Sequence, residues 1–323
     1  MEALLNVNDL RVSFATNGGI LKAVRGVSFF LNRGEVLGIA GESGSGKSVT
    51  AHSLFRLLPG NTAGLEGRVL FNGENLLEKT EEELRALRGS GISMIFQEPG
   101  RSFDQLFSIE KTMAETIRLH NPELSKEEVF QRSVTLLDEV KIPEPASRLK
   151  NFPHQFSGGM LQRIMIAISL ASNPEILIAD EPTTSLDVTI QAEIIRLLME
   201  LKEKRNLSII FISHDLSLLA NISDRIAVMY AGLIMEEGPV KEVLEAPHHP
   251  YTKALLDSVP KLGDHYSGKK VSTIPGSVPD PLHHEPGCPF APRCGLAGGE
   301  CREKIPEMTT EPRQYRCIRK GAK

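Results

Sequence analysis

The chain has 323 residues, a formal net charge of −4, 41% hydrophobic positions and 24% charged positions. This balance is typical of a globular protein and excludes a disordered or fibrous chain, and the length allows one large domain with an appendage or two domains. The acidic charge, the lack of Trp and the 5% aromatic content argue against nucleic acid as a partner. No apolar run reaches the roughly 18 residues of a membrane span. Residues 1–6 lack the pattern of a secretion signal, so we expect a cytoplasmic protein.

The sequence of the amino-terminal part predicts an antiparallel hairpin, followed by a strand that leads into a helix. Residues 1 to about 34 alternate polar and apolar positions around the turn Asn17-Gly18-Gly19, which indicates an antiparallel hairpin. The apolar run 35–40 then leads into a glycine-rich turn and a helix-favouring segment that ends at Pro59-Gly60. We therefore expect a strand, a loop and a helix in that order.

Two segments match the spacing of a capping box, in which Ser or Thr is followed three positions later by Glu. The pairs are Thr80 with Glu83 and Ser125 with Glu128. They predict helices near 81–88 and 126–140, in a middle third that is mostly helical. In the second helix we expect one apolar face, formed by Phe130, Val134 and Leu137.

Two later apolar runs, 175–180 and 207–213, are of the kind that is buried on both faces of a parallel sheet. A helical pattern over 188–205 separates them, so an α/β core is expected. After residue 260, prolines interrupt every periodic stretch. We place a domain boundary near 260 and expect a small, loop-rich tail held together by its cysteines.

A phosphate-binding motif lies between the run 35–40 and the helix that follows it. Gly41–Ser48 fits the pattern G-x-x-x-x-G-K-S/T in the strand-to-helix context that the motif requires. Glycines let the backbone wrap a phosphate, and the N–H groups at the helix start bind the anion. Lys47 would reach the β and γ oxygens, and Ser48 would ligate Mg²⁺. The residues expected to contact the nucleotide are Gly41, Ser43, Gly44, Ser45, Gly46, Lys47, Ser48 and Val49.

Two carboxylates follow directly on the apolar run that ends near residue 180. Asp180 and Glu181 stand where a Walker B element places its acidic pair. Asp180 would hold Mg²⁺ through water, and Glu181 would act as general base on the attacking water. Kinases and small GTPases also use a P-loop, so these two elements predict nucleotide binding but do not identify the class of nucleotide-binding protein.

Further motifs distinguish between those classes. Phe156–Arg163 contains Ser-Gly-Gly just upstream of the acidic pair, Gln97 ends the run 91–97, Ser185-Leu186-Asp187 follows the acidic pair, and His214 ends the next strand. In this order and spacing they resemble the ATP-binding-cassette (ABC) ATPases, and the resemblance covers residues 1 to about 260. It implies a P-loop, RecA-like α/β domain with an antiparallel β subdomain and a helical subdomain at about 98–164.

The resemblance also implies roles for individual residues. Two cassettes would enclose two ATP molecules, with the Walker motifs of one subunit facing the Ser-Gly-Gly signature of the other. Gln97 would touch Mg²⁺ or the attacking water, and His214 would contact the γ-phosphate. Asp187 would link the two sites, and Phe14 would stack on adenine unless it is only a core side chain. The signature residues expected at the partner's γ-phosphate are Ser157, Gly158 and Gly159.

Several features indicate a branch of this family. The signature has Phe156 and Met160 in place of the commoner Leu and Gln, and a Met there is similar to the peptide-importer branch. Asp104-Gln105 departs from the Asn-Pro that this branch more often carries, beside the expected contact with the membrane subunit. The stretch 249–256 and the proline-rich tail resemble the oligopeptide/dipeptide and nickel importer ATPases and their C-terminal extension, here residues 261–323.

This closer resemblance implies an ATPase that powers a peptide importer from the cytoplasmic face of the cell membrane. Its partners would be a second ATPase subunit, identical or paralogous, two integral membrane permease subunits and, indirectly, an extracytoplasmic substrate-binding protein. The same motor could instead import nickel or oligosaccharides. Two further functions are compatible with the sequence, a soluble ABC ATPase outside transport and a cassette-shaped binding module without turnover.

The four cysteines of the chain all lie in the tail. They are Cys288, Cys294, Cys301 and Cys317. Clustered thiols in a reducing compartment are more often a metal site than disulfides. Their spacing does not match the C-x₂-C pairs of common zinc sites, and the extension that they resemble holds an iron–sulfur cluster in some members. We expect a [4Fe–4S] cluster, with zinc or free thiols as alternatives. Two histidine pairs, 248–249 and 283–284, are interpreted as solvated loop residues.

Overall fold

The structure is a computed structural model that describes residues 3–184, 186–259, 273–309 and 313–319. Its residues fall into two compact units, one formed by 1–78 and 211–323 and the other by 79–210. Among the described helices, none combines the length and the apolar character that spanning a bilayer requires. The expected boundary near residue 260 lies outside the described residues.

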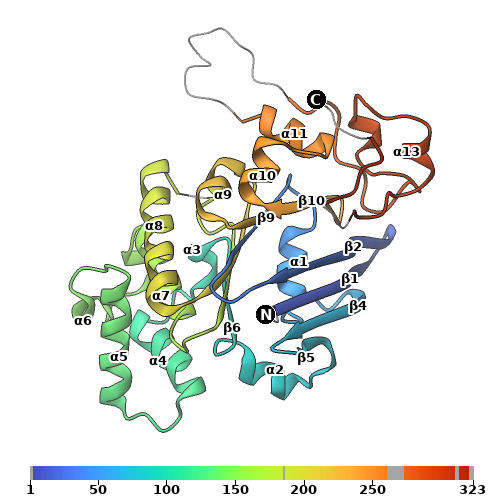
Figure 1. The fold of residues 1–323 in the computed structure, drawn as a ribbon. Coiled ribbons are helices and arrows are strands. Elements are labelled where there is room, and N and C mark those ends of the chain that lie inside the picture. Colours follow the sequence, from blue (N-terminus) through green and yellow to red (C-terminus); the bar gives the residue numbers. More distant parts are fainter. Residues whose placement is uncertain (1–2, 185, 260–272, 310–312, 320–323) are drawn as a thin grey trace, which may run out of the picture. The chain divides into compact units, whose positions relative to one another are not determined.

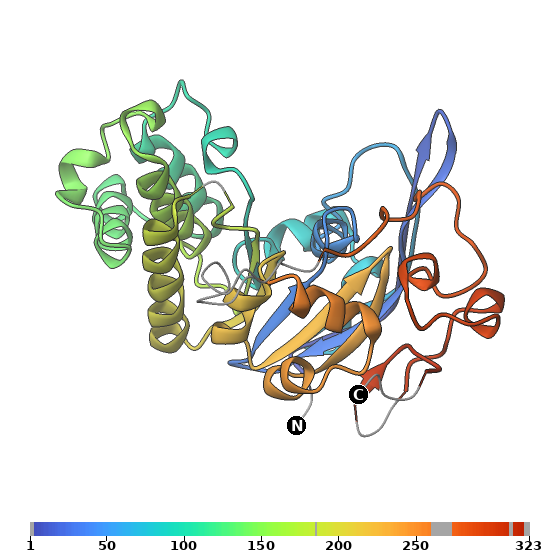
Figure 2. The same ribbon diagram turned by 90° about the horizontal axis from the view of Figure 1, so that it is seen from above.

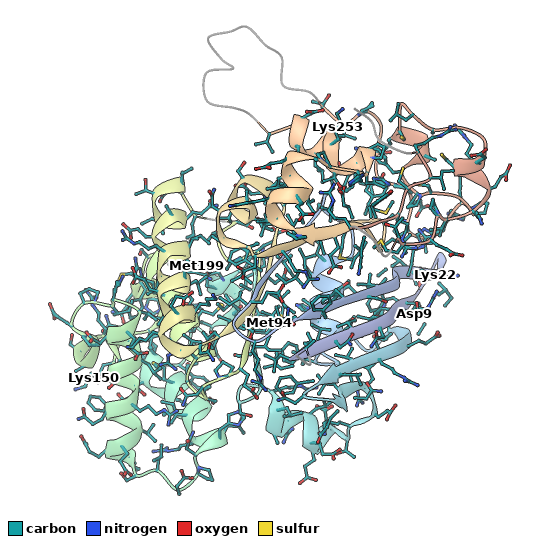
Figure 3. The ribbon with its side chains drawn as sticks, in the orientation of Figure 1. Asp9, Lys22, Met94, Lys150, Met199 and Lys253 are labelled. Atoms are coloured by element: carbon teal, nitrogen blue, oxygen red, sulfur yellow. The ribbon has the colours of Figure 1, made fainter. Side chains whose placement is uncertain are left out.

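The first unit contains an antiparallel sheet with the strand order β2-β1-β4-β5 (Figure 1). Its strands are β1 (Leu5–Thr16), β2 (Gly19–Leu31), β4 (Thr62–Phe71) and β5 (Glu74–Asn75), and a 3₁₀ turn, Leu76–Glu78, follows β5. The hairpin predicted for residues 1–34 is confirmed, because Leu5 pairs with Leu31 and Thr16 with Gly19. Apolar side chains of β1, such as Val7 and Val12, are buried, and exposed Asp9 and Lys22 project from the strands (Figure 3).

A second set of strands in this unit has the order β11-β10-β9-β3. The strands are β3 (Val36–Ala40), β9 (Arg225–Tyr230), β10 (Leu233–Pro239) and β11 (Gln314–Tyr315). Strand β3 runs parallel to β9, while β11 pairs antiparallel with β10 through Tyr315 and Glu236. The tail that carries the cysteines therefore adds its own strand to this sheet, which its proline-rich sequence does not indicate.

Short helices complete the first unit. They are α1 (Lys47–Ser53), α9 (Leu216–Ile222), α10 (Val240–Glu245), α11 (Pro250–Asp257), the 3₁₀ turn Ala291–Arg293 and α13 (Glu300–Glu303). Figure 2 shows α10 and α11 lying beside the strands β9 and β10. Helix α1 ends earlier than its sequence predicts, because the chain turns back at Arg56, whose φ is 56°, and the Leu57 N–H bonds to the carbonyl of His52.

The second unit is mostly helical around two parallel strands, β6 (Ile92–Ile95) and β7 (Ile176–Asp180). Its helices are α2 (Glu81–Leu87), α3 (Pro99–Ser102), α4 (Ile109–His120), α5 (Lys126–Glu139), α6 (Pro145–Arg148), α7 (Gly158–Ser169) and α8 (Val188–Arg205), with a 3₁₀ turn at Pro153–Gln155. Strand β8 (Ser208–Ser213) is fully buried and leads the chain back to the first unit. Met94 lies inside this unit and Lys150 on its outside (Figure 3).

Both predicted capping boxes are confirmed at the starts of α2 and α5. In each, the hydroxyl of the cap accepts from the backbone N–H of the Glu, and the Glu carboxylate accepts from the backbone N–H of the cap. The predicted face of α5 is wrong by a small rotation. Phe130 and Val134 are only half-buried, whereas Val129 and Leu136 are buried together with Leu137. Contacts with α4 and α7 decide which side of α5 is covered, and the spacing of apolar residues allowed both answers.

Candidate nucleotide-binding site

The residues predicted to bind nucleotide are divided between the two units. The first unit holds the loop Gly41–Ser48, Val49, Phe14 and His214, and the second holds Gln97, Ser157–Gly159, Asp180, Glu181 and Asp187. Each unit therefore carries one part of the expected chemistry, the phosphate-binding loop in the first and the acidic pair with the signature in the second.

The loop Gly41–Ser48 follows β3 and opens α1, as predicted. Glycine is required at two of its turns, because Gly41 and Gly46 have φ angles of 151° and 101°. A Cβ at Gly41 would lie 2.2 Å from the carbonyl oxygen of Met229, and one at Gly46 would lie 2.6 Å from that of Ala23. The loop backbone is therefore pressed against β9 and β2, which fixes its curvature.

The ammonium group of Lys47 lies in the hollow of this loop. Its side chain is 4% exposed, and Nζ donates to the carbonyl oxygens of Gly41 at 2.8 Å and Glu42 at 3.0 Å. The hydroxyl of Ser45 is buried and has no hydrogen-bond partner among the described residues. A buried cation and an unsatisfied hydroxyl in one loop are donors suited to an anion, since leaving the hydroxyl unpaired costs free energy. The loop therefore fits a phosphate chain.

The remaining predicted contacts in this unit are more exposed. Ser43 and Gly44 face solvent at the loop tip, and Ser48 and Val49 are half-buried in the first turn of α1. His214 is exposed directly after β8. Phe14 is half-buried on β1 opposite Leu21, so it is not a fully buried core side chain, and its contact with adenine stays a prediction.

The two predicted carboxylates lie at the end of β7. Asp180 is 3% exposed, whereas Glu181 is half-buried and has a φ of 45°. A positive φ is unfavourable for a residue with a Cβ, and such strain persists where the surroundings impose it, often at functional sites. Oε2 of Glu181 accepts hydrogen bonds from Gln97 Nε2 at 3.1 Å and from Thr184 Oγ1 at 2.8 Å. The structure thus brings Gln97 and Glu181 together.

The Ser-Gly-Gly segment begins helix α7. Ser157 is its N-cap, and the Ser157 hydroxyl accepts from the N–H of Met160. Ser157 and Gly158 are exposed, so the positive end of a 12-residue helix faces solvent. A Cβ at Gly159 would lie 2.7 Å from Cγ2 of Ile190. Gly159 therefore allows α7 to approach α8 closely.

Asp187 also has a structural role within its own segment, which the family resemblance did not imply. Its Oδ1 accepts from the N–H groups of Thr189 and Ile190, at 3.1 and 3.0 Å, and so caps α8.

Glu42 makes a contact that the sequence analysis did not predict. Its carboxylate is bound by Arg293, 251 positions further along the chain. No spacing rule could have identified this pair.

The four cysteines are free thiols that line one small pocket, with about 20 Å³ of room, together with Phe290, Arg316 and Arg319 among others. Burial raises the pKa of the Cys288 thiol to about 11, and the nearby thiols Cys317 and Cys294 add to the rise. Within the described residues, no three His, Cys, Asp or Glu side chains converge as a metal-holding group. The four thiols thus line the same pocket, but in the described residues they are not arranged as a metal-binding site.

The interpretation of the histidine pairs as solvated is wrong for His249. This side chain is 1% exposed, and its Nδ1 accepts from the N–H of Tyr251 at 3.0 Å, which caps α11. Burial lowers its pKa to about 3. His248 stacks on Tyr315 with a ring separation of 4.7 Å, so both residues of this pair pack within the fold.

Comparison with known families assigns most of the chain. A family model described as ABC transporter matches residues 24–184, and one described as oligopeptide/dipeptide transporter, C-terminal region, matches residues 235–301. The chain is 48% identical to the dipeptide transport ATP-binding protein DppD of Bacillus subtilis, over 96% of this chain and 92% of the relative. It is also 48% identical to the oligopeptide transport ATP-binding protein OppD of Escherichia coli, over 98% and 94%.

Solved structures agree with this assignment. A dimeric ATP-binding cassette in a post-hydrolysis state, bound to ADP and Pi, is 26% identical and aligns with a TM-score of 0.65 over 73% of this chain and 98% of its own. The protein cbiO1 of Clostridium perfringens, part of the ABC transporter complex cbiONQ, is 28% identical and aligns with a TM-score of 0.64 over 76% and 92%. The fold is therefore that of an ATP-binding cassette.

Proposed function

The chain belongs to the ATP-binding-cassette family of transporter ATPases, in its oligopeptide/dipeptide branch, and we propose that it hydrolyses ATP to power a membrane importer of di- or oligopeptides. The observation that carries the ATPase part is the position of Lys47. Its buried ammonium group donates to two carbonyl oxygens of the glycine-rich loop. When ATP binds, the group would donate to phosphate oxygens instead.

The side chains at the end of β7 and on the loop divide the chemistry of hydrolysis. The hydroxyl of Ser48 would ligate Mg²⁺ and Asp180 would hold it through water, and the ion would neutralise charge on the phosphates. Glu181 would accept the proton of the attacking water, and the Gln97 amide on its Oε2 would orient the same water. His214 would contact the γ-phosphate from the end of β8.

A second cassette would complete each site. The exposed N-terminus of α7, with Ser157, Gly158 and Gly159, supplies N–H groups and a helix dipole suited to an anion. We propose that this end binds the γ-phosphate held by the partner subunit and that Asp187 links the two sites. Residues 1–260 would form the cassette, with a helical subdomain at 98–164, and 261–323 the extension.

The importer would contain two permease subunits in the membrane, and this chain would bind them from the cytoplasmic face. A substrate-binding protein outside the cytoplasm would deliver the cargo. Support comes from relatives named for dipeptide and oligopeptide transport that align over nearly the whole chain. Nickel or an oligosaccharide as cargo is the outcome that would contradict the peptide assignment.

We also propose that the four cysteines bind one metal centre, with a [4Fe–4S] cluster preferred over zinc. Thiolates are the ligands of both, and all four thiols line one pocket. Arg316 and Arg319 line it too and would offset the negative charge of metal-bound thiolates. The side chains would have to move inward to ligate, and the centre would then cross-link the tail.

Transport is tested in a strain that lacks this chain and needs an external peptide for an essential amino acid. Growth on the peptide should return with the wild-type chain and not with Glu181→Gln, while growth on the free amino acid stays equal. Growth on the peptide with Glu181→Gln would contradict the proposal. Growth on the peptide in the strain that lacks the chain would contradict it as well. Copurified permease subunits would identify the partners.

The metal centre is tested by anaerobic purification followed by iron, sulfide and zinc analysis. About four iron and four sulfide per chain, with a brown colour, is the expected result. Stoichiometric zinc would contradict the cluster, and four titratable thiols without metal would contradict any metal centre.

A further inference from the structure

The carboxylate of Glu42, the second residue of the phosphate-binding loop, is bound by an arginine from the cysteine-bearing tail. Arg293 Nη1 donates to Oε2 of Glu42 at 2.7 Å, and Nη2 donates to Oε1 at 3.1 Å. The Arg293 side chain is 5% exposed and that of Glu42 27%. This is a two-pronged, largely buried ion pair, the strongest form of such a contact.

The rest of the guanidinium group is fixed as well. Its Nε donates to the carbonyl of Pro275 at 2.8 Å, and Nη1 also donates to the Tyr230 hydroxyl at 3.2 Å. Phe290, in the same turn as Arg293, packs against Tyr230 and Tyr251 with ring separations of 5.4 and 5.2 Å. Arg293 therefore has one defined position, set by neighbours on the tail and on β9.

Glu42 is fixed through its backbone too. Its N–H donates to the hydroxyl of Tyr251 at 3.0 Å, and its carbonyl oxygen accepts from Lys47 Nζ and from the N–H of Ser45, at 3.0 and 3.2 Å. A shift of Glu42 would thus move the group that holds Lys47. The ion pair with Arg293 acts on the phosphate-binding geometry through this residue.

Charge gives the contact a second consequence. Glu42 and Lys47 are the two charged residues of Gly41–Ser48, so the loop by itself has no net charge. A carboxylate in a phosphate-binding loop repels the phosphates of ATP, and a half-buried one is only weakly screened. Arg293 cancels that charge and leaves Lys47 in excess.

We propose that Arg293 is a positioning residue for the nucleotide site: it holds and neutralises Glu42, so that ATP binding by the cassette depends on the folded cysteine-bearing tail. Arg293 does not need to touch the nucleotide for this. Its turn is tied to the cysteine pocket, since the N–H of Cys288 bonds to the carbonyl of Cys301 at 2.8 Å and that of Ala291 to Cys288 at 2.9 Å. The inference rests on the proposed ATPase function.

The test compares ATP dissociation constants, KM and kcat for the full-length wild type and four variants. Arg293→Ala should raise the dissociation constant and KM about tenfold, because it leaves an uncompensated carboxylate in the loop, while kcat at saturating ATP changes less than about threefold. Arg293→Ala combined with Glu42→Gln should return both constants part of the way to the wild-type value, because it removes the repulsion of the phosphates but not the loss of the contact that holds Glu42. Arg302→Ala, which removes an exposed arginine of the same tail, is the matched control and should change neither.

The fourth variant, Glu42→Gln alone, keeps the test decisive if Arg293→Ala does not fold. It removes the repulsion and leaves Arg293 in place, so ATP should bind as tightly as to the wild type or more tightly. Normal ATP affinity in Arg293→Ala, no recovery in the double variant, or a tenfold loss in Glu42→Gln would each overturn the proposal. A wild-type chain that binds no ATP would contradict the proposed function instead.

Discussion

The side-chain amide of Gln97 donates a 3.1 Å hydrogen bond to Oε2 of Glu181. Gln97 follows β6 and Glu181 follows β7, two parallel strands that pair along Ile92–Ile95. Parallel neighbours end at the same edge of a sheet, so the two side chains meet although 84 positions separate them. The amide thus contacts the carboxylate that we assign as the base.

Replacing Glu181 by Gln is expected to stop hydrolysis while ATP stays bound. The amide keeps the size and hydrogen bonding of the side chain but cannot accept a proton, so turnover should fall about 10²-fold or more. Phosphate release and retention of labelled ATP measure the two effects. Glu203→Gln, at an exposed position of α8, is the control and should keep wild-type turnover. Wild-type turnover in Glu181→Gln would reject the assignment.

Ser157→Arg is expected to abolish ATP-driven dimerisation and to leave ATP binding by the single chain nearly intact. The bulky cation would occupy the exposed start of α7, where we place the partner's γ-phosphate. Light scattering in a Glu181→Gln background with ATP and Mg²⁺ measures the dimer. The substitution also removes an N-cap, worth about 1 kcal/mol, so Ser125→Ala at the cap of α5 serves as control. Dimers formed by Ser157→Arg would contradict a role in trans.

Adjacent glycines of the signature should respond oppositely to Ala. A Cβ at Gly159 would lie 2.7 Å from Ile190 Cγ2, and one at Gly158 would lie 3.6 Å from Leu186 Cδ2, an ordinary contact. Gly159→Ala should therefore lower the free energy of unfolding by about 1–3 kcal/mol, while Gly158→Ala should leave it equal or higher. Urea unfolding measures both.

The double variant Gly159→Ala with Ile190→Ala checks the cause of that loss. It removes the methyl group that the new Cβ would meet. The loss in free energy of unfolding should therefore be smaller in the double variant than the sum of the losses in the two single variants. A simple sum would show that the loss has another origin.

Stability should decline as the pH falls below about 6.5, in part because of His249. Burial lowers the pKa of the folded His249 side chain to about 3, so the unfolded chain takes up a proton first. The contribution of His249 is complete above its unfolded pKa near 6.5 and is lost as the pH falls, by up to about 1.4 kcal/mol per pH unit. The carboxylate of Glu236 accepts from the backbone N–H groups of His248 and His249.

His249→Asn tests this dependence, because Asn keeps a cap acceptor for α11 but does not titrate in this range. Between about pH 6.5 and 5.5 the free energy of unfolding should fall less in the variant than in the wild type, by about 1 kcal/mol. His154→Asn changes an exposed histidine elsewhere in the chain and serves as the control. Equal slopes in all three proteins would contradict the assignment to His249.

Local signals in the sequence were sufficient for several elements. The helix predicted at 188–205 has those bounds, and the capping boxes at Thr80 and Ser125 start helices as expected. Each depends on contacts within a few positions, which the chain encodes directly. The loop Gly41–Ser48 was identified for the same reason, since its shape follows from glycines and a helix start that adjoin one another.

Features that depend on packing between distant segments were decided only by the tertiary structure. The covered face of α5, the burial of His249 and the strand that Tyr315 adds to β10 depend on which neighbours arrive from elsewhere in the chain. The ion pair between Glu42 and Arg293 is of this kind as well. Each residue looks exposed or unpartnered when its own segment is considered alone. Burial and Coulomb energy act between surfaces in space, so sequence spacing carries no record of a contact across 251 positions.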